Sequence, residues 1–137
     1  MTQPAASTSI TSHSGVAEDV SVCRSTGVAV SIAYEVFGAA EHPAADALVV
    51  ITGLNCNSRK FPAAFCRQLA AAGPFRVVRF DNRDCGKSTK FDRFPNPPML
   101  KQALPRWMSE VAPVYTLEDM ADDTAARSTN QESESPS

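Results

Sequence analysis

The sequence predicts an α/β fold of about four strands, in which an antiparallel pair comes before a parallel strand–helix–strand unit. A short, continuous apolar run at 47–51 is typical of a strand that is buried on both faces of a sheet, and the run FRVVRF at 75–80 is predicted to be a second buried strand. A segment of helical periodicity, 61–72, separates them. Upstream of both, the partly alternating run 28–37 is typical of a strand with one buried face.

The antiparallel pair is expected at the start of the globular part. Val20 and Val22 come before a turn at 25–27, and the run from Val28 to Phe37 follows that turn. Four apolar residues of the second run fall on one face: Val28, Val30, Ile32 and Tyr34. A loop rich in alanine and polar residues then leads to the strand at 47–51.

The segment 61–72 is predicted to be the helix of the parallel unit. Large apolar residues recur at every fourth position: Phe61, Phe65 and Leu69. Pro62 suits the first turn of a helix, and Gly73 followed by a proline is a stop signal. Strand–helix–strand units with short connections are nearly always right-handed, so we expect a parallel core.

A second helix is predicted to begin at Thr116. The connection before it is long and irregular, with prolines at 95, 97, 98, 105 and 113. Thr116 can cap the helix, and the acidic residues between Glu118 and Asp123 suit its positive end. We expect this helix to end after about three turns, near Ala126.

The 137 residues are enough for one domain. Residues 1–17 are rich in serine and threonine and are predicted to be a disordered lead. Residues 127–137 have no apolar side chain and are predicted to be a disordered polar tail. The globular domain is therefore expected at 18–126.

Composition argues against several classes of function. With 13 basic and 15 acidic residues the net charge is -2, which argues against nucleic-acid binding through a basic face. The four cysteines form no Cys-x-x-Cys pair and both histidines lie apart from them, so no metal site and no cofactor are expected. No apolar run is long enough for a membrane helix and no secretory signal is recognisable, which predicts a cytoplasmic protein.

The stretch DNRDCGKST at 81–89 ends like a phosphate-binding P-loop. A P-loop, however, has its first glycine five residues before the second, and Asp81 stands there instead of a glycine. A carboxylate at this place would repel a phosphate. The prolines that follow the stretch also prevent the helix that a P-loop needs. The sequence therefore argues against a nucleotide site.

Three segments in their order resemble the N-terminal part of an α/β-hydrolase domain. They are the Thr52-Gly53-Leu54 turn after a strand, the motif Asp81-x-Arg83-x-x-Gly86-x-Ser88 after the next strand, and the helix from Tyr115 to Asp123. The variant with Asp84 after Arg83 is similar to a subgroup of aclacinomycin methylesterase-like hydrolases. The resemblance covers about residues 18–126 and implies hydrolysis of a small-molecule carboxylic ester or related acyl bond.

The resemblance also implies roles for individual residues. The backbone N–H of Leu54, beside Gly53, would be a donor to the oxyanion that forms on an attacked carbonyl. Asp81, Arg83, Gly86 and Ser88 would form a structural turn, in which Gly86 takes a positive φ and Ser88 bonds to the backbone. We also expect an ion pair between Asp81 and Arg83.

The catalytic groups of that family are absent from these 137 residues. The family places its serine in Gly-x-Ser-x-Gly, followed by an acid and a histidine, and the sequence contains no Gly-x-Ser-x-Gly. We therefore assign no catalytic residue and expect a truncated, inactive chain. A non-catalytic interaction protein is the alternative. The resemblance implies a further strand beside 47–51, so this strand is expected to be an exposed edge that allows self-association.

Overall fold

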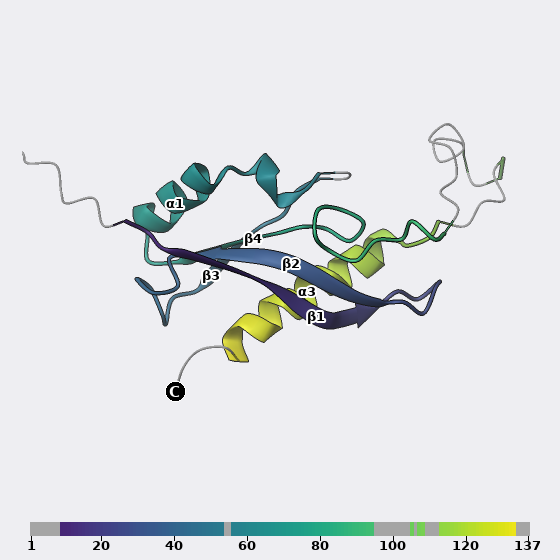
Figure 1. Ribbon diagram of the computed structural model, residues 1–137, viewed down its shortest axis with the longest axis horizontal. Helices are drawn as coiled ribbons and strands as arrows, with labels where there is room; N and C mark the ends of the chain where they lie inside the picture. The colour runs from purple at the N-terminus through teal and green to yellow at the C-terminus, as the bar shows by residue number, and fades with distance from the viewer. Residues whose placement is uncertain (1–8, 54–55, 95–104, 106, 109–112, 134–137) are drawn as a thin grey trace, which may run out of the picture.

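The chain forms one four-stranded sheet with a helix on each side (Figure 1). The structure is a computed structural model that describes residues 9–53, 56–94, 105, 107–108 and 113–133, with side chains up to residue 126. The strands are β1 (Ser12–Val22), β2 (Ala29–Phe37), β3 (Ala47–Val50) and β4 (Arg76–Phe80). The helices are the 3-10 turn η1 (Ser58–Lys60), α1 (Ala63–Ala72) and α3 (Leu117–Ser133).

The order of the strands across the sheet is β1-β2-β4-β3. The pairs β1/β2 and β2/β4 are antiparallel, whereas β3/β4 is parallel, with Leu48 opposite Val77. The prediction of an α/β fold with an antiparallel start and a parallel strand–helix–strand unit is therefore confirmed. Within the described residues β3 pairs with β4 alone, so β3 is an edge of the sheet.

Two apolar clusters hold the helices and loops against the sheet. One cluster lies under α1 and consists of Phe37, Cys66, Ala70 and Val77. The other contains Val30, Ile32 and Phe80 together with Cys23 and Phe91, and Tyr115 packs against it. Figure 1 shows α1 and α3 on opposite sides of the strands, so the molecule has three layers.

Helix α1 begins two residues later than the sequence predicts and is rotated about its axis. Pro62 is its N-cap and Gly73 its C-cap. The buried residues are Cys66 and Ala70, whereas Phe65 is 41% exposed. Small side chains face the sheet because the helix lies close to it: a Cβ added to Gly38 would lie 3.1 Å from that of Ala70.

Both ends of the ordered part extend further than the sequence predicts. Strand β1 begins at Ser12, within the expected lead, because an edge strand gains its order from main-chain bonds to β2 and needs few apolar residues. Helix α3 continues through Ser133, because each added residue of a nucleated helix contributes one more backbone bond. Within the described residues, no helix is both long and apolar enough to cross a membrane.

Candidate functional site

The turn that follows β4 is built around the carboxylate of Asp81. This side chain is buried; its Oδ1 accepts the backbone N–H of Ser58 at 2.8 Å and its Oδ2 that of Lys87 at 3.0 Å. Gly86 has φ +50°, and a Cβ there would lie 2.0 Å from Asp81 Oδ2. Only glycine can therefore bring the backbone this close to the carboxylate.

The Asp81 carboxylate takes the place that a phosphate would need. The N–H of Lys87, which a P-loop would offer to a nucleotide, is bonded to Asp81 instead. Burial alone would raise the pKa of Asp81, but the N–H groups of Lys87 and Ser58 outweigh it and lower that pKa below its ordinary value. Asp81 therefore acts as an internal anion that closes the turn.

Ser88 ties the same turn to β2. Its hydroxyl donates to the carbonyl of Asp81 at 2.5 Å and accepts the N–H of Ala33 at 3.0 Å. One residue further on, the Thr89 hydroxyl accepts the N–H of Ser31 at 2.8 Å. The turn is thus fixed to the sheet by side-chain oxygens on alternate backbone positions of β2.

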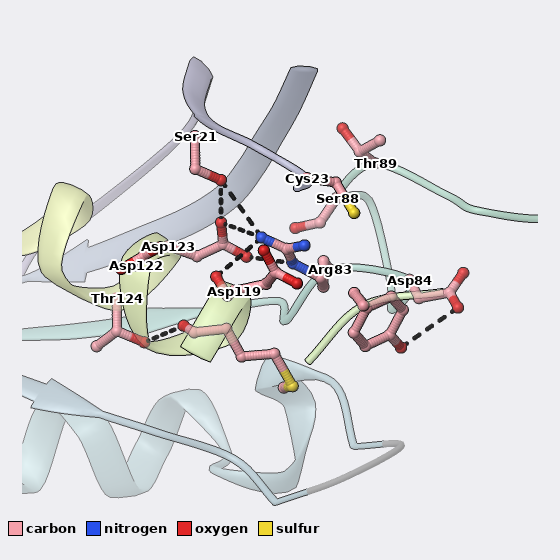
Figure 2. Close-up of polar contacts among 12 residues, drawn as sticks. Ser21, Cys23, Arg83, Asp84, Ser88, Thr89, Asp119, Asp122, Asp123 and Thr124 are labelled. Atoms are coloured by element: carbon pink, nitrogen blue, oxygen red, sulfur yellow. Dashed lines mark hydrogen bonds and ion pairs between the residues drawn. The ribbon is translucent and has the colours of Figure 1, made fainter. Parts of the chain in front are cut away.

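Arg83 pairs with Asp123 of α3, and the expected ion pair with Asp81 is wrong. Its Nε lies 2.7 Å from Asp123 Oδ2 and its Nη2 lies 2.8 Å from Asp123 Oδ1. Nη2 also donates to the carbonyl of Asp119 at 2.8 Å and to Ser21 at 3.4 Å, as Figure 2 shows. Asp81 is unavailable to Arg83 because its oxygens bind backbone N–H groups.

The Arg83 guanidinium also lies against aromatic rings. Its central carbon is 5.8 Å from the ring centroid of Phe91 and 5.5 Å from that of Tyr115. Its Nη1 is buried with no hydrogen-bond partner among the described residues. The rings attract the cation electrostatically and compensate in part for that missing bond.

The first turn of α3 is fixed by Thr116 and Asp119. The N–H of Asp119 bonds to the Thr116 hydroxyl at 3.3 Å, while Asp119 Oδ2 accepts the N–H of Thr116 at 2.8 Å. This is a capping box with aspartate as its acid. Burial would raise the pKa of Asp119, but bonds from the N–H groups of Thr116 and Arg24 lower it overall.

Asp84 occupies a backbone conformation that favours glycine. Its φ is +67°, in the left-handed region that residues with a Cβ rarely adopt. Its carboxylate accepts the N–H of Phe91 at 3.1 Å and the hydroxyl of Tyr115 at 3.4 Å. Burial and the charge of Asp84 raise the pKa of Tyr115 to about 12.

The Thr52–Gly53 turn lies beside the Asp81 turn. Gly53 is described, whereas Leu54, the expected oxyanion donor, lies outside the described residues. The side chain of Asn82 donates to the carbonyl of Thr52 at 3.1 Å and so joins the two turns. No pattern in the sequence distinguishes Asn82, which stands at the unspecified position x of the Asp81-x-Arg83 motif.

A hollow of about 580 Å³ opens between β1, β2, η1 and the Asp81 turn. Charged side chains form much of its wall, and the buried Arg79 is already paired with Glu35 at 2.6 Å. Small-molecule sites more often have apolar walls with a few polar groups, so this hollow lacks their character. Within the described residues no cluster of histidine, cysteine or acidic side chains is suited to hold a metal ion.

Part of the chain is similar to two curated Streptomyces proteins. Rhodomycin D methylesterase DauP from Streptomyces sp. (strain C5) is 46% identical over 50 residues, and rhodomycin D methylesterase DnrP from Streptomyces peucetius is 42% identical over 50 residues. Each match covers 36% of this chain but only 16% of the relative's length. No protein-family profile matches the chain. A segment of this chain is therefore related to proteins named as ester hydrolases.

Proposed function

We propose that this chain forms the oxyanion-side part of an α/β-hydrolase-type ester hydrolase, whose substrate is a small-molecule carboxylic ester. The observation that carries the proposal is the similarity to two proteins named methylesterases. The sheet supports it, because β3 and β4 are parallel and so bring the Thr52–Gly53 turn and the Asp81 turn together at the carboxyl ends of the two strands.

The chemistry that these residues could supply is electrostatic. When a nucleophile attacks an ester carbonyl, negative charge develops on its oxygen, and backbone N–H groups at a glycine turn can stabilise that charge. Gly53 suits this role because no described atom lies within 4 Å of the place where its Cβ would be. The nucleophile, acid and base would come from residues outside this sequence, since it contains no Gly-x-Ser-x-Gly.

A chimera tests the proposal. Residues 47–89 of this chain, which hold β3, α1, β4 and both turns, replace the corresponding segment of the DauP methylesterase, and methylesterase activity is measured. We expect the chimera to keep kcat/KM within about tenfold of the native relative, or roughly 1.4 kcal/mol of transition-state stabilisation. A chimera that folds, as judged by circular dichroism, but has no activity would contradict the proposal.

The isolated chain should not hydrolyse esters. An assay with a nitrophenyl ester and the purified 137-residue protein checks this expectation. Turnover that is abolished by a serine-directed inhibitor would show an activated serine within these residues and would contradict it.

A second candidate function is that of a non-catalytic interaction protein that self-associates through β3. The observation that favours it is the position of β3 at the edge of the sheet, where Leu48 is 40% exposed and the adjoining Ile51 56% exposed. Strand edges with apolar side chains and no charges readily pair with another chain.

A further inference from the structure

The side chain of Asn82 forms hydrogen bonds between the Asp81 turn and the Thr52–Gly53 turn, at the carboxyl ends of β3 and β4. It is 5% exposed, and its amide nitrogen lies close to three oxygen atoms. These are the carbonyl of Thr52 at 3.1 Å, the hydroxyl of Thr52 at 3.2 Å and the carbonyl of Gly53 at 3.4 Å. Only a donor is tolerated at the centre of three acceptors.

We propose that Asn82 is a positioning residue: it fixes the Thr52–Gly53 peptide unit and thereby the direction of the Gly53 N–H, which would stabilise an oxyanion. The inference rests on the proposed ester hydrolase function. It adds a residue that supports the site without touching the substrate.

Peptide geometry links the carbonyls to the N–H groups. A trans peptide unit is planar, with its C=O and N–H on opposite sides. The carbonyl of Thr52 shares a peptide unit with the N–H of Gly53. A donor that holds the Thr52 carbonyl therefore also sets the direction of the Gly53 N–H.

A relay of hydrogen bonds extends this control to the far end of the turn. The Thr52 hydroxyl, which accepts from Asn82, donates to the carbonyl of Cys56 at 3.0 Å. The N–H of Cys56 returns to the carbonyl of Gly53 at 3.2 Å. Because no described atom packs where a Cβ of Gly53 would lie, these polar contacts rather than packing hold that residue.

The position of Asn82 is itself fixed from both sides. Before it, the Asp81 carboxylate holds the N–H groups of Ser58 and Lys87. After it, Arg83 is bound to Asp123 by two hydrogen bonds. The donor is thus pre-organised, so little ordering remains to be done when charge develops on a bound ester.

Backbone amide exchange in the full 137-residue chain tests the geometry. Asn82→Asp keeps the shape of the side chain but replaces the amide donor by a carboxylate, which can only accept and would repel the three oxygen atoms. The Gly53 carbonyl should then be held less firmly, so the N–H of Cys56, which bonds to it, should exchange about tenfold faster or more. Asn57→Asp is the matched control: its side chain only accepts, from the N–H of Arg59, and should leave Cys56 unchanged. Exchange of Val78 in β4 reports any global loss of stability.

A second pair of variants keeps the test decisive if Asn82→Asp does not fold. Thr52→Val removes the hydroxyl of the relay at constant shape, whereas Thr52→Ser restores it. We expect faster exchange of Cys56 in the valine variant and native exchange in the serine variant. Unchanged exchange of Cys56 in both Asn82→Asp and Thr52→Val would overturn the inference.

Kinetics in the DauP chimera separate this inference from the proposed function. Asn82→Asp should lower kcat by about tenfold to a hundredfold with KM nearly unchanged, because oxyanion contacts strengthen in the transition state. An active chimera whose kcat is insensitive to Asn82→Asp would overturn the inference and leave the proposed function intact. An inactive chimera would overturn the proposed function, and amide exchange would still decide whether Asn82 fixes the turn.

Discussion

The guanidinium of Arg83 and the carboxylate of Asp123 form a two-point ion pair, at 2.7 and 2.8 Å, with 0% and 3% of the two side chains exposed. The pair joins the turn after β4 to α3, which lies on the other side of the sheet from α1 (Figure 1). This buried interaction therefore links the candidate site to the attachment of α3.

Removal of either partner should be strongly destabilising. Asp123→Asn removes the carboxylate that is bonded to the guanidinium, and Arg83→Lys replaces a planar fork by a single ammonium group. We expect each variant to lose about 3 kcal/mol or more of unfolding free energy, as is typical when one partner of a buried pair is removed. Urea denaturation followed by circular dichroism measures the loss.

A neighbouring surface pair provides the control for that experiment. An ion pair between Arg24, which follows β1, and Asp122 of α3 also joins these two parts of the chain. However, 61% of the Arg24 side chain and 52% of the Asp122 side chain are exposed. Asp122→Asn should change stability by about 0.5 kcal/mol or less. Equal losses of unfolding free energy in Asp122→Asn and Asp123→Asn would show that the buried Arg83 pair stabilises the fold no more than the exposed pair does.

The partner of Arg83 could not be predicted from the sequence, whereas several local features could. The capping of α3 by Thr116 and the positive φ of Gly86 depend on neighbours in the chain, and the sequence indicates both. The partner of Arg83 lies 40 residues away and is set by where α3 docks. Asp81 is nearer in sequence, but its carboxylate is directed to the backbone.

Packing explains the other differences. The sequence favours Phe65 as a buried residue of α1 because it is large and apolar, yet the close approach of helix and sheet selects Cys66 and Ala70. The contacts of Asn82 could not be predicted, because one amide in a loop carries no pattern and because these contacts depend on where β3 ends beside β4. Tertiary contacts of this kind are not encoded in periodicity.

Asp84 should tolerate asparagine better than alanine. At φ +67° asparagine is accepted more readily than alanine, and it keeps an acceptor for the N–H of Phe91. We expect Asp84→Asn to stay within about 1 kcal/mol of the native protein and Asp84→Ala to lose about 2 kcal/mol. Thermal unfolding of both variants, with Asp84→Gly between them, checks the order. An alanine variant as stable as the native chain would contradict it.

Tyr115 should make the fold sensitive to strong base. Its pKa is raised to about 12 by burial and by the charge of Asp84. A raised pKa contributes stability that is fully present below the ordinary value of 10.0 and is lost as the pH rises through about 12. Tyr115→Phe should therefore flatten the fall of stability in this range, as measured by urea denaturation at several pH values. The same slope in both proteins would contradict this.

Asp81 should make the stability of the fold depend on pH in the acidic range. Its pKa lies below the ordinary value of 3.8, so its contribution to stability is present above that value and is lost as the pH falls below it. Asp81→Asn should lower stability at neutral pH and reduce the further loss on acidification. Thermal unfolding between about pH 6 and pH 2 measures both effects. An equal further loss on acidification in both proteins would contradict this role of Asp81.

Self-association through β3 is the last expectation to test, and it separates the interaction protein from the hydrolase part. Leu48 is 40% exposed on β3, at one edge of the sheet, while Val16 is 51% exposed on β1, at the other. If β3 pairs with a second copy, sedimentation should show a concentration-dependent dimer. Leu48→Lys should then abolish the dimer, because a charge on an edge strand opposes pairing, whereas Val16→Lys should not. A native chain that stays monomeric at micromolar concentration would contradict the interaction role. Equal effects of the two lysine variants would show that general apolar exposure, rather than the β3 edge, drives association.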